Sequence, residues 1–513
     1  MTSSANPKNR AGARRLMGET YLLFYLAAAD FIGHMFVAGN YGYFRDELYY
    51  IVSGQHLAPG YVDFPPVIAL IAAMLYLLTH DSLVSIHVVP AFAGSALVFA
   101  TGLLAREMGG GRRAQVVAAL ATLATAQLAF ASIFSMDILD ALWWTLIAYT
   151  MARLIKHDEP RLWIVIGIVA GIGLMTKLTI FFFVIAIVVG LLASSRSFIR
   201  TRWFLLAVAI ALALLSPYVL WNALNGWPTV DFFIHHGGLN GSGPLDFIAT
   251  QLLIFNPVNL PLVIAGLFFF FRKEGRSFRV FGWAFIFLFA LLALTNGKPY
   301  FMFAAYPMVL AGGAILLERT SRSRRWIPPA YLTALIVSGL ALAPLLMPIL
   351  PPPVFATSYG GLTGAANSAA AQTNGGPFPQ YLGDRFGWDT MVSKISQIYD
   401  GLPVQQRSQA CIFTSNYGEA SALVFLGAGQ GLPPVISGHN NYYLWGPGSC
   451  SGAVLLTVGV NSTQLSHAYG SVTQIGTITC KYCMSSEDDT PVYLCTGPLL
   501  TMQQIWPFTK HFN

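Results

Sequence analysis

Long runs of apolar residues, separated by short polar breaks, fill the first 350 positions of the chain. A helix needs about 20 mostly apolar residues to cross the hydrocarbon core of a bilayer. Eleven runs approach this length, and we predict that each forms a membrane-spanning helix. They cover residues 21–39, 83–105, 114–133, 138–155, 161–175, 177–194, 203–221, 247–271, 279–296, 299–318 and 326–348.

A further apolar stretch, residues 65–78, is too short to span the bilayer comfortably. It begins with Pro65-Pro66 and is followed by the polar pair His80-Asp81. Its length and its flanking residues favour a helix that lies on the membrane surface.

The composition agrees with this pattern. The chain has 513 residues, of which 55% are hydrophobic and 10% are charged. An average soluble domain carries about 25% charged residues. The composition therefore excludes an ordinary soluble enzyme, a disordered chain and a nucleic-acid-binding protein, and it predicts a lipid bilayer as the partner of the chain.

The positive residues give the orientation. With the N-terminus in the cytoplasm, every inner loop is basic, and the outer loops hold only Arg45, Lys177 and Lys298. This distribution follows the positive-inside rule. A twelfth span at 65–78 would invert every later loop and destroy the pattern. We therefore predict a multi-pass protein with a cytoplasmic N-terminus and an extracytoplasmic C-terminal region.

The pattern divides the chain into a membrane domain, residues 1–350, and a soluble module, residues 379–513, joined by a Gly/Ala/Ser/Asn-rich linker, residues 351–378. The first outer loop covers residues 41–82. Within the module, predicted helices at 388–399 and 419–426 alternate with strand-like runs at 410–413 and 453–460. This alternation favours a small α/β domain.

All five cysteines lie in the module: Cys411, Cys450, Cys480, Cys483 and Cys495. The pair Cys480-x-x-Cys483 is compatible with a tight disulfide, a redox motif or half of a metal site. The second half of a zinc site is not evident, and disulfides persist outside the cytoplasm. We therefore favour a structural disulfide between these two residues.

Acidic residues gather in the outer loops. Asp81 and Asp246 fit the simple explanation that outer loops tolerate acids. Arg45-Asp46-Glu47 fits it less well, because three consecutive charges stand among tyrosines just after the first span. Asp137 and Asp140 are three residues apart and share one helix face. We expect the carboxylates of these two loops to converge on one pocket.

One ionisable pair lies within a predicted span. Asp30 and His34 are four residues apart on the first helix. Such residues inside a membrane often mark a functional site. Here we favour a buried, hydrogen-bonded pair that packs the helices.

Seven short stretches carry a resemblance to a known family. They are Tyr43-Phe44-Arg45-Asp46-Glu47-Leu48-Tyr49-Tyr50, Gly60-Tyr61-Val62-Asp63-Phe64-Pro65-Pro66, Gly173-Leu174-Met175-Thr176-Lys177, Gly297-Lys298-Pro299-Tyr300-Phe301, Ala305-Tyr306-Pro307, Thr414-Ser415-Asn416-Tyr417-Gly418-Glu419-Ala420 and Ser437-Gly438-His439-Asn440. In these stretches the chain resembles the protein O-mannosyltransferase-like glycosyltransferases, a group that includes the bacterial aminoarabinose and galacturonic acid transferases of lipid A. The resemblance covers nearly the whole chain.

The resemblance implies a mainly α, multi-span fold of the GT-C glycosyltransferase class with a C-terminal α/β domain. It also implies transfer of a sugar, with inversion, from a polyprenyl-phosphate-sugar donor to an envelope acceptor, which is a lipid, a glycan or a protein. The expected location is the inner (plasma) membrane of a bacterium, with the chemistry on the extracytoplasmic side.

The chemistry assigns roles to the first loop. An acceptor hydroxyl that attacks the anomeric carbon needs a general base within hydrogen-bond reach. The essential first-loop aspartate of the family matches Asp46, for which a salt bridge to Arg45 or Lys298 is the alternative role. Glu47 is the second catalytic candidate, although a structural role suits it better.

The departing phosphate needs cations and donors that stabilise its charge. Arg45, Lys177 and Lys298 with Tyr300 are the candidates for donor phosphate binding. Lys177 has the alternative of pairing with Asp137 or Asp140. The predicted sugar- or acceptor-binding residues are Asp63, Tyr49, Asp137, Asp140, His235 and His439.

We expect no cofactor. The carboxylates could hold a divalent metal ion, but the resembled family mostly works without one. Two alternative functions remain open at this point. A transporter or flippase for a lipid-linked sugar would require mid-membrane charges and an internal repeat, and a non-catalytic envelope scaffold would act through the soluble module.

Overall fold

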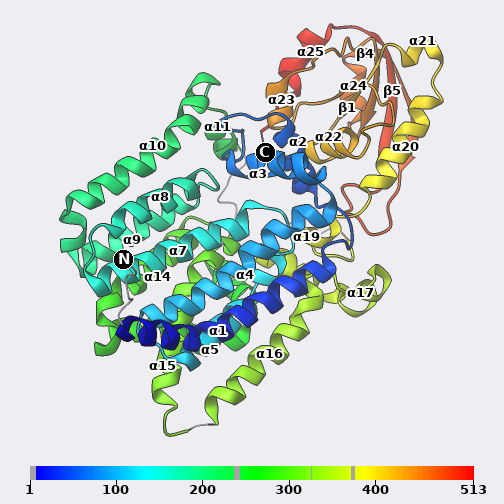
Figure 1. The fold of residues 1–513 in the computed structure, drawn as a ribbon. Coiled ribbons are helices and arrows are strands. Elements are labelled where there is room, and N and C mark those ends of the chain that lie inside the picture. The colour runs from blue at the N-terminus through cyan, green and yellow to red at the C-terminus, as the bar shows by residue number, and fades with distance from the viewer. Residues whose placement is uncertain (1–6, 236–242, 325, 371–375, 513) are drawn as a thin grey trace, which may run out of the picture.

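The computed structural model describes residues 7–235, 243–324, 326–370 and 376–512. The described residues up to Leu346 form a helix bundle, and the soluble module stands at one end of it (Figure 1). We refer to this end as the module end.

The bundle and its connections contain helices of very different length. Their bounds are α1 (Pro7–Val37), α2 (Arg45–Gln55), α3 (Val67–Thr79), α4 (Leu83–Glu107), α5 (Arg112–Leu123), α6 (Gln127–Phe130), α7 (Met136–His157), α8 (Leu162–Leu174), α9 (Ile180–Ser194), η1 (Arg196–Arg200), α10 (Arg202–Leu224), α11 (Pro228–His235), α12 (Pro244–Phe255), η2 (Pro257–Asn259), α13 (Leu260–Phe271), η3 (Lys273–Phe278), α14 (Arg279–Leu294), η4 (Pro299–Ala305), α15 (Tyr306–Thr320) and α16 (Ile327–Leu346).

Each of the eleven predicted spans contains helix, but not all are single spanning helices: the predicted span 114–133 divides into the short helices α5 and α6. Within the described residues, seven helices are long and apolar enough to cross a membrane. They are Thr20–Val37, Leu83–Glu107, Met136–His157, Arg202–Leu224, Lys273–Leu294, Pro299–Thr320 and Ile327–Leu346. The predicted spans 161–175 and 177–194 form the shorter apolar helices α8 and α9.

The predicted span 247–271 is not a straight helix. It breaks into α12 and α13, which meet at 94°. Asn256 at the break has φ 66°, its side-chain oxygen accepts from Val258 N at 3.1 Å, and its amide donates to Ala124 O at 2.9 Å. Pro257 follows and offers no backbone N–H. Asn256 therefore caps the residues that follow the break and ties them to the end of α5.

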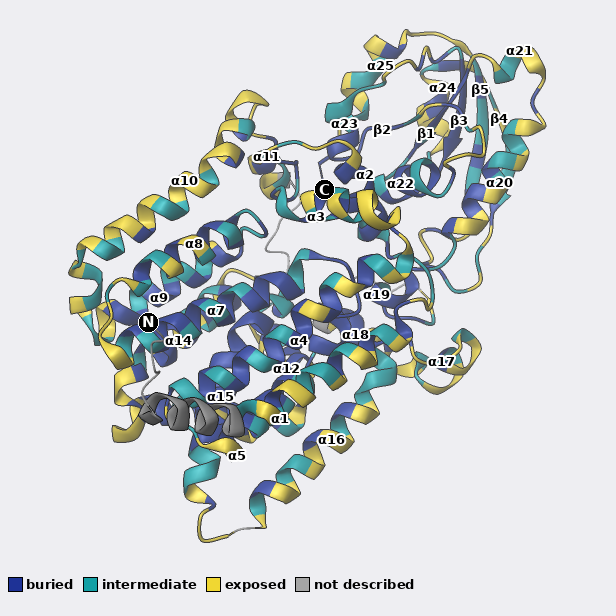
Figure 2. Ribbon diagram, viewed as in Figure 1, coloured by how far each residue is buried: buried dark blue, intermediate teal, exposed yellow. Residues whose placement is uncertain are grey.

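The outer surface of the bundle is apolar. Exposed leucines follow α10, among them Leu205, Leu212 and Leu220, and Ile336, Val337 and Leu340 are exposed on α16. Figure 2 shows these two helices largely exposed, in contrast to the mostly buried α15. An apolar surface of this extent would be unstable in water and is suited to lipid.

The short helix α3 fits its predicted place on a membrane surface. Leu70, Met74, Leu77 and Leu78 are exposed, and their spacing places them on one face of the helix.

Close contacts at glycines hold the centre of the bundle together. A Cβ atom at Gly266 of α13 would overlap the carbonyl oxygen of Val309 in α15, and one at Gly313 would overlap that of Leu262. Small residues allow the two helices to approach in this way, as is common in membrane bundles.

The pair in the first span is structural, as predicted. His34 Nδ1 lies 3.2 Å from Asp30 Oδ1. Asp30 Oδ2 also accepts from Ser95 Oγ at 3.1 Å and from Gln127 Nε2 at 3.0 Å. The buried carboxylate therefore joins α1 to α4 and α6.

The residues after the bundle form short helices and one sheet. The helices are α17 (Pro352–Ser358), η5 (Gly360–Leu362), α18 (Thr363–Ala370), α19 (Gln380–Gly383), α20 (Trp388–Asp400), α21 (Val404–Arg407), α22 (Tyr417–Phe425), α23 (Asn441–Trp445), α24 (Ser462–Ser466) and α25 (Met502–Thr509). Three of them, α17, η5 and α18, lie within the predicted linker.

The sheet has five strands in the order β2-β1-β3-β5-β4. They are β1 (Ala410–Thr414), β2 (Val435–Ser437), β3 (Val454–Val458), β4 (Tyr469–Ile478) and β5 (Thr490–Pro498). The strand β1 runs parallel to β2 and β3, and β5 is antiparallel to β3 and β4. The α/β character of the module is therefore confirmed.

The favoured disulfide is wrong. Cys411 at β1 pairs with Cys450, which precedes β3. Cys480, Cys483 and Cys495 are free thiols. The hydrophobic packing that brings the start of β1 beside the segment before β3 decides this pairing, and spacing along the chain did not reveal it.

Candidate active site

The first turn of α2 carries the three consecutive charges, and each of them points to a different neighbour. Glu47 Oε2 accepts from its own loop at Phe44 N, 2.8 Å away. Its Oε1 accepts from Phe134 N at 2.7 Å and lies 2.9 Å from His87 Nε2. Burial raises the pKa of Glu47, but His87 and the backbone donor reverse the shift and lower it overall. These contacts anchor α2 to α4 and favour a structural role for Glu47.

Asp46 faces the soluble module. Its Oδ1 accepts a hydrogen bond from the Tyr417 hydroxyl at 2.7 Å. Burial raises the pKa of Asp46 to about 6, against the opposing effects of the Tyr417 hydrogen bond and the Arg45 charge. A carboxylate that titrates near neutral pH is well matched to accept a proton under physiological conditions.

Arg45 is bound by two carboxylates of the module. Its Nη2 donates to Asp384 Oδ1 at 2.8 Å and to Glu487 Oε1 at 2.9 Å. This pairing favours a role in docking the module over the predicted contact with a phosphate.

Lys177 lies between a carboxylate and two aromatic rings. It forms an ion pair with Asp137, and its Nζ is 5.3 Å from the Tyr300 ring centroid and 5.0 Å from that of Phe301. The alternative partner that the sequence left open is therefore Asp137. The contact also brings the predicted cation, Tyr300 and the start of α7 together.

Asp140 has a different environment from Asp137. It is buried, and it accepts from Trp144 Nε1 at 2.8 Å and from Thr179 Oγ1 at 2.6 Å. The two carboxylates are close in sequence, but one pairs with Lys177 and the other fastens α7 to the start of α9. The structure thus gives Asp140 a packing role.

Lys298 precedes η4 and is partly buried. Burial and the nearby Lys177 lower its pKa, while the carboxylates of Asp137 and Asp46 act in the opposite direction. Within the described residues no ion pair joins Lys298 to a carboxylate. Lys298 is therefore a cation beside the Asp46 and Asp137 carboxylates whose charge is available to an anionic ligand.

The second motif of the first loop contacts the same end of the module. Tyr49 OH donates to Asp63 Oδ1 at 3.1 Å, and Asn440 Nδ2 donates to Asp63 Oδ2 at 3.3 Å. The amide N–H of Asn441 donates to Tyr49 OH at 3.1 Å. Burial raises the pKa of Asp63 to about 7. Tyr49 and Asp63 therefore lie in one hydrogen-bonded network that crosses from the loop to the module.

The two predicted histidines are His439 and His235. His439 is buried, and its ring packs 4.8 Å from that of Tyr417 and 4.4 Å from that of His511. His439 therefore packs against the Tyr417 ring and helps to hold it in place. His235 is the last residue of α11, and its side chain lies outside the described residues.

Sequence reasoning missed the module residues that contact the first loop. Tyr417, Asn441, Asp384 and Glu487 were not assigned a role. Tyr417 belongs to one of the stretches that carry the family resemblance, and that was the available signal.

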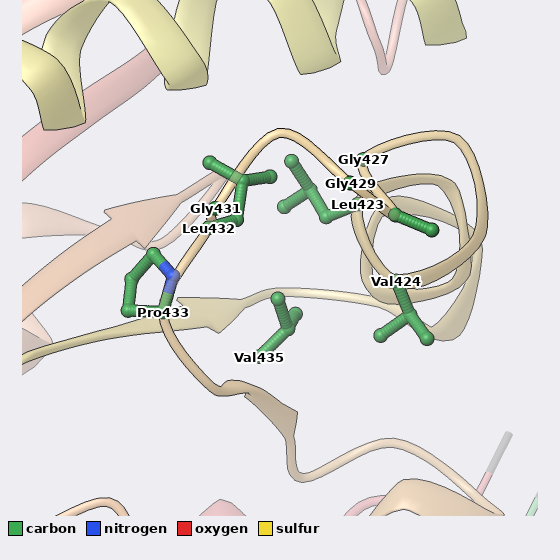
Figure 3. Close-up of a pocket in the computed structure, with 9 residues that line it drawn as sticks. Leu423, Val424, Gly427, Gly429, Gly431, Leu432, Pro433 and Val435 are labelled. Atoms are coloured by element: carbon green, nitrogen blue, oxygen red, sulfur yellow. The ribbon is translucent and has the colours of Figure 1, made fainter.

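No metal centre is evident at the site within the described residues. Across the described parts of the chain, no group of three or more His, Cys, Asp or Glu residues is placed to hold a metal ion. A hollow of about 460 Å³ lies elsewhere, between α22 and the loop that follows it (Figure 3). Its lining contains no charged residue, so it is unsuited to an anionic donor. The lining residues are Leu423, Val424, Gly427, Ala428, Gly429, Gly431, Leu432, Pro433 and Val435.

Comparison with known proteins finds a family that one segment of the chain is similar to. Residues 63–221 match the model of the family described as dolichyl-phosphate-mannose-protein mannosyltransferase. Over this segment the chain is similar to the family, and the match indicates a glycosyltransferase. The matched segment contains Asp63, Asp137, Asp140 and Lys177, whereas Asp46 and Lys298 lie outside it. No curated protein sequence matches the chain.

Solved structures confirm the GT-C fold. ArnT from Cupriavidus metallidurans in the apo state has a TM-score of 0.61 and 15% identity, over 92% of this chain and 97% of that one. The same protein bound to undecaprenyl phosphate has a TM-score of 0.57 and 15% identity, over 93% of this chain and 98% of that one. The likeness covers both the bundle and the module, and the seven long apolar helices of the described residues support a multi-pass membrane protein.

Proposed function

We propose that this glycosyltransferase moves a sugar from a polyprenyl-phosphate donor to an envelope acceptor, which is a lipid, a glycan or a protein. The observation that carries the proposal is the position of Asp46. Its carboxyl has a pKa of about 6, and the charge of Asp137 contributes to raising that pKa. The Asp46 charge in turn acts to raise the pKa of Lys298. The likeness to a protein that binds undecaprenyl phosphate supports the choice of donor.

In the proposed reaction, the acceptor hydroxyl attacks the anomeric carbon on the face opposite the phosphate. Asp46 takes the hydroxyl proton as the new C–O bond forms. The bond from the anomeric carbon to the phosphate oxygen breaks, and the polyprenyl phosphate leaves with the electron pair. Displacement from the opposite face inverts the anomeric centre.

Lys298 is the proposed partner of the departing phosphate. A charge that develops at the phosphate oxygen is stabilised by a cation already in place. Lys177 adds positive charge nearby, with Asp137 fixing its position. Tyr300, whose ring contacts Lys177, is the proposed aromatic wall. We propose that no metal is needed, so that activity persists in excess EDTA.

The proposed location is the extracytoplasmic side of a bacterial inner membrane. The helices α4, α7 and α15 end together, far from the module end. Lys156 there contacts Glu107 O, and Glu318 accepts from Gly111 N and Arg113 N. The basic loops at this end support a cytoplasmic position for it under the positive-inside rule.

Two experiments test the proposal. Mass spectrometry of envelope lipids and glycoproteins, with and without the gene, identifies the sugar and the acceptor. Purified Asp46→Asn protein is then assayed with the matching lipid donor, and loss of the base should lower kcat by about 10²- to 10⁴-fold. The matched control is Asp81→Asn, a carboxylate of the same loop with φ 51°, a backbone conformation that asparagine accepts. Equal rates for Asp46→Asn and wild type would refute the base.

A further inference from the structure

The tyrosine that contacts Asp46 comes from a distant part of the chain. Tyr417 is 371 residues beyond Asp46 and is the first residue of α22. Its ring stacks on that of Tyr49 with the centroids 4.5 Å apart and the planes at 25°. The His439 ring also packs against Tyr417, with the two ring centroids 4.8 Å apart. The hydroxyl is therefore held toward Asp46 by a packed aromatic group.

The start of α22 is shaped to fit the first turn of α2. Asn416 caps α22 by accepting from Glu419 N at 2.9 Å. A Cβ atom at Gly418 would stand 2.5 Å from Arg45 Cγ, so only glycine allows the two helices this approach. The Arg45 guanidinium is clamped by Asp384 and Glu487 of the same module. Contacts on both sides of Asp46 thus fix where Tyr417 stands.

We propose that Tyr417 is a positioning residue for the carboxylate of Asp46, so that the soluble module completes the transfer site that the first loop begins. The inference rests on the proposed role of Asp46 as the base. Tyr417 donates to Oδ1 and leaves Oδ2 as the oxygen that receives the proton of the acceptor. The hydrogen bond also holds the side chain against rotation while the acceptor approaches.

The hydrogen bond has an effect that can be measured. A donor to a carboxylate favours its ionised form, and here it opposes the rise that burial causes in the pKa of Asp46. Removing the hydroxyl should therefore raise that pKa, and strengthening the donor should lower it. If Tyr417 only packed the interface, neither change would shift the pKa of Asp46.

The experiment compares two changes at one position. Tyr417→Phe keeps the stacked ring and removes the hydroxyl. We expect kcat at pH 8 to fall about tenfold, with the donor KM unchanged and the acid inflection of kcat higher by about one pH unit. Incorporation of a fluorinated tyrosine at position 417 makes the hydroxyl a stronger donor, and the inflection should move down. Shifts of the inflection in opposite directions for the two changes are specific to a hydrogen bond.

The control is Tyr442→Phe. Tyr442 is buried in the same module, stacks on Tyr49 at 6.4 Å and has its hydroxyl 3.0 Å from Ser421 Oγ. This variant should keep the wild-type inflection. If Tyr417→Phe does not fold, the fluorinated protein alone decides, because it retains every contact.

The outcomes separate the two proposals. An active Asp46→Asn protein would overturn the base and the positioning role together. An inactive Asp46→Asn protein, with wild-type pH profiles for both Tyr417 changes, would overturn only the positioning role.

Discussion

A carboxyl group with a pKa of about 6 acts as a base only above that pH, and Asp46 is such a group. Burial raises its pKa from 3.8, so the carboxylate form is lost as the pH falls through about 6. We expect kcat/KM to be constant near pH 8 and to fall about tenfold for each pH unit well below 6. The measurement is a pH–rate profile with purified enzyme. A profile that stays flat down to pH 4.5 would contradict the assignment.

Lys298 provides a second prediction at the scale of single residues. Lys298→Ala should raise the donor KM by about 10-fold or more, because a contact to a charged group contributes roughly 1.5–3 kcal/mol. Lys298→Arg retains the charge and should recover most of the affinity. Donor binding is measured by titration with the polyprenyl-phosphate sugar. Unchanged affinity in the alanine variant would exclude the phosphate contact.

At the scale of elements, the break between α12 and α13 depends on one side chain. Asn256 has φ 66°, caps Val258 N and donates to Ala124 O. Asn256→Ala should destabilise the bundle by about 2 kcal/mol, since it removes a cap and keeps a strained backbone. Asn256→Gly relieves the strain and should lie between alanine and wild type. Thermal unfolding in detergent measures the stabilities of the three proteins. An alanine variant as stable as the glycine variant, or more stable, would refute this explanation.

The contact between α2 and α22 was beyond the reach of sequence patterns. The sequence predicted a helix at 419–426, which largely coincides with α22, but it treated residues 41–82 as a loop and did not predict α2. That Tyr417 meets Asp46 depends on how the module is seated on the loop. The seating is the sum of many small contacts, and no local pattern encodes it.

At the scale of the whole molecule, Arg45 forms an ionic link between bundle and module. The double variant Asp384→Asn, Glu487→Gln removes both of its carboxylate partners. An unpaired buried charge is costly, so we expect the module to loosen and kcat to fall. Limited proteolysis should then release the module faster than in wild type.

The control for this variant is Asp400→Asn. Asp400 faces Arg407 at 3.9 Å on an exposed surface of the same module, and such pairs contribute little. Equal proteolysis of the double variant and the control would show that Arg45 does not secure the module.

Composition, hydropathy and the placement of charge determined much about this protein. They indicated a multi-pass membrane protein, most of its helical segments and a separate C-terminal α/β module, because each depends on the local preference of a segment for lipid or water. They also brought Asp46, Asp63, Asp137, Lys177 and Lys298 onto one short set of candidates.

Only the tertiary structure decided how those candidates divide. Arg45 forms ion pairs with Asp384 and Glu487, and Lys177 forms one with Asp137. Asp140 accepts a hydrogen bond that packs α7 against the start of α9, and Cys411 forms a disulfide with Cys450. Arg45 and Glu487 are 442 residues apart in the chain. Charged side chains pair with groups that are close in space, and the packing of the whole chain sets which groups are close. The sequence therefore identified the candidate residues, and the fold showed which partners they have.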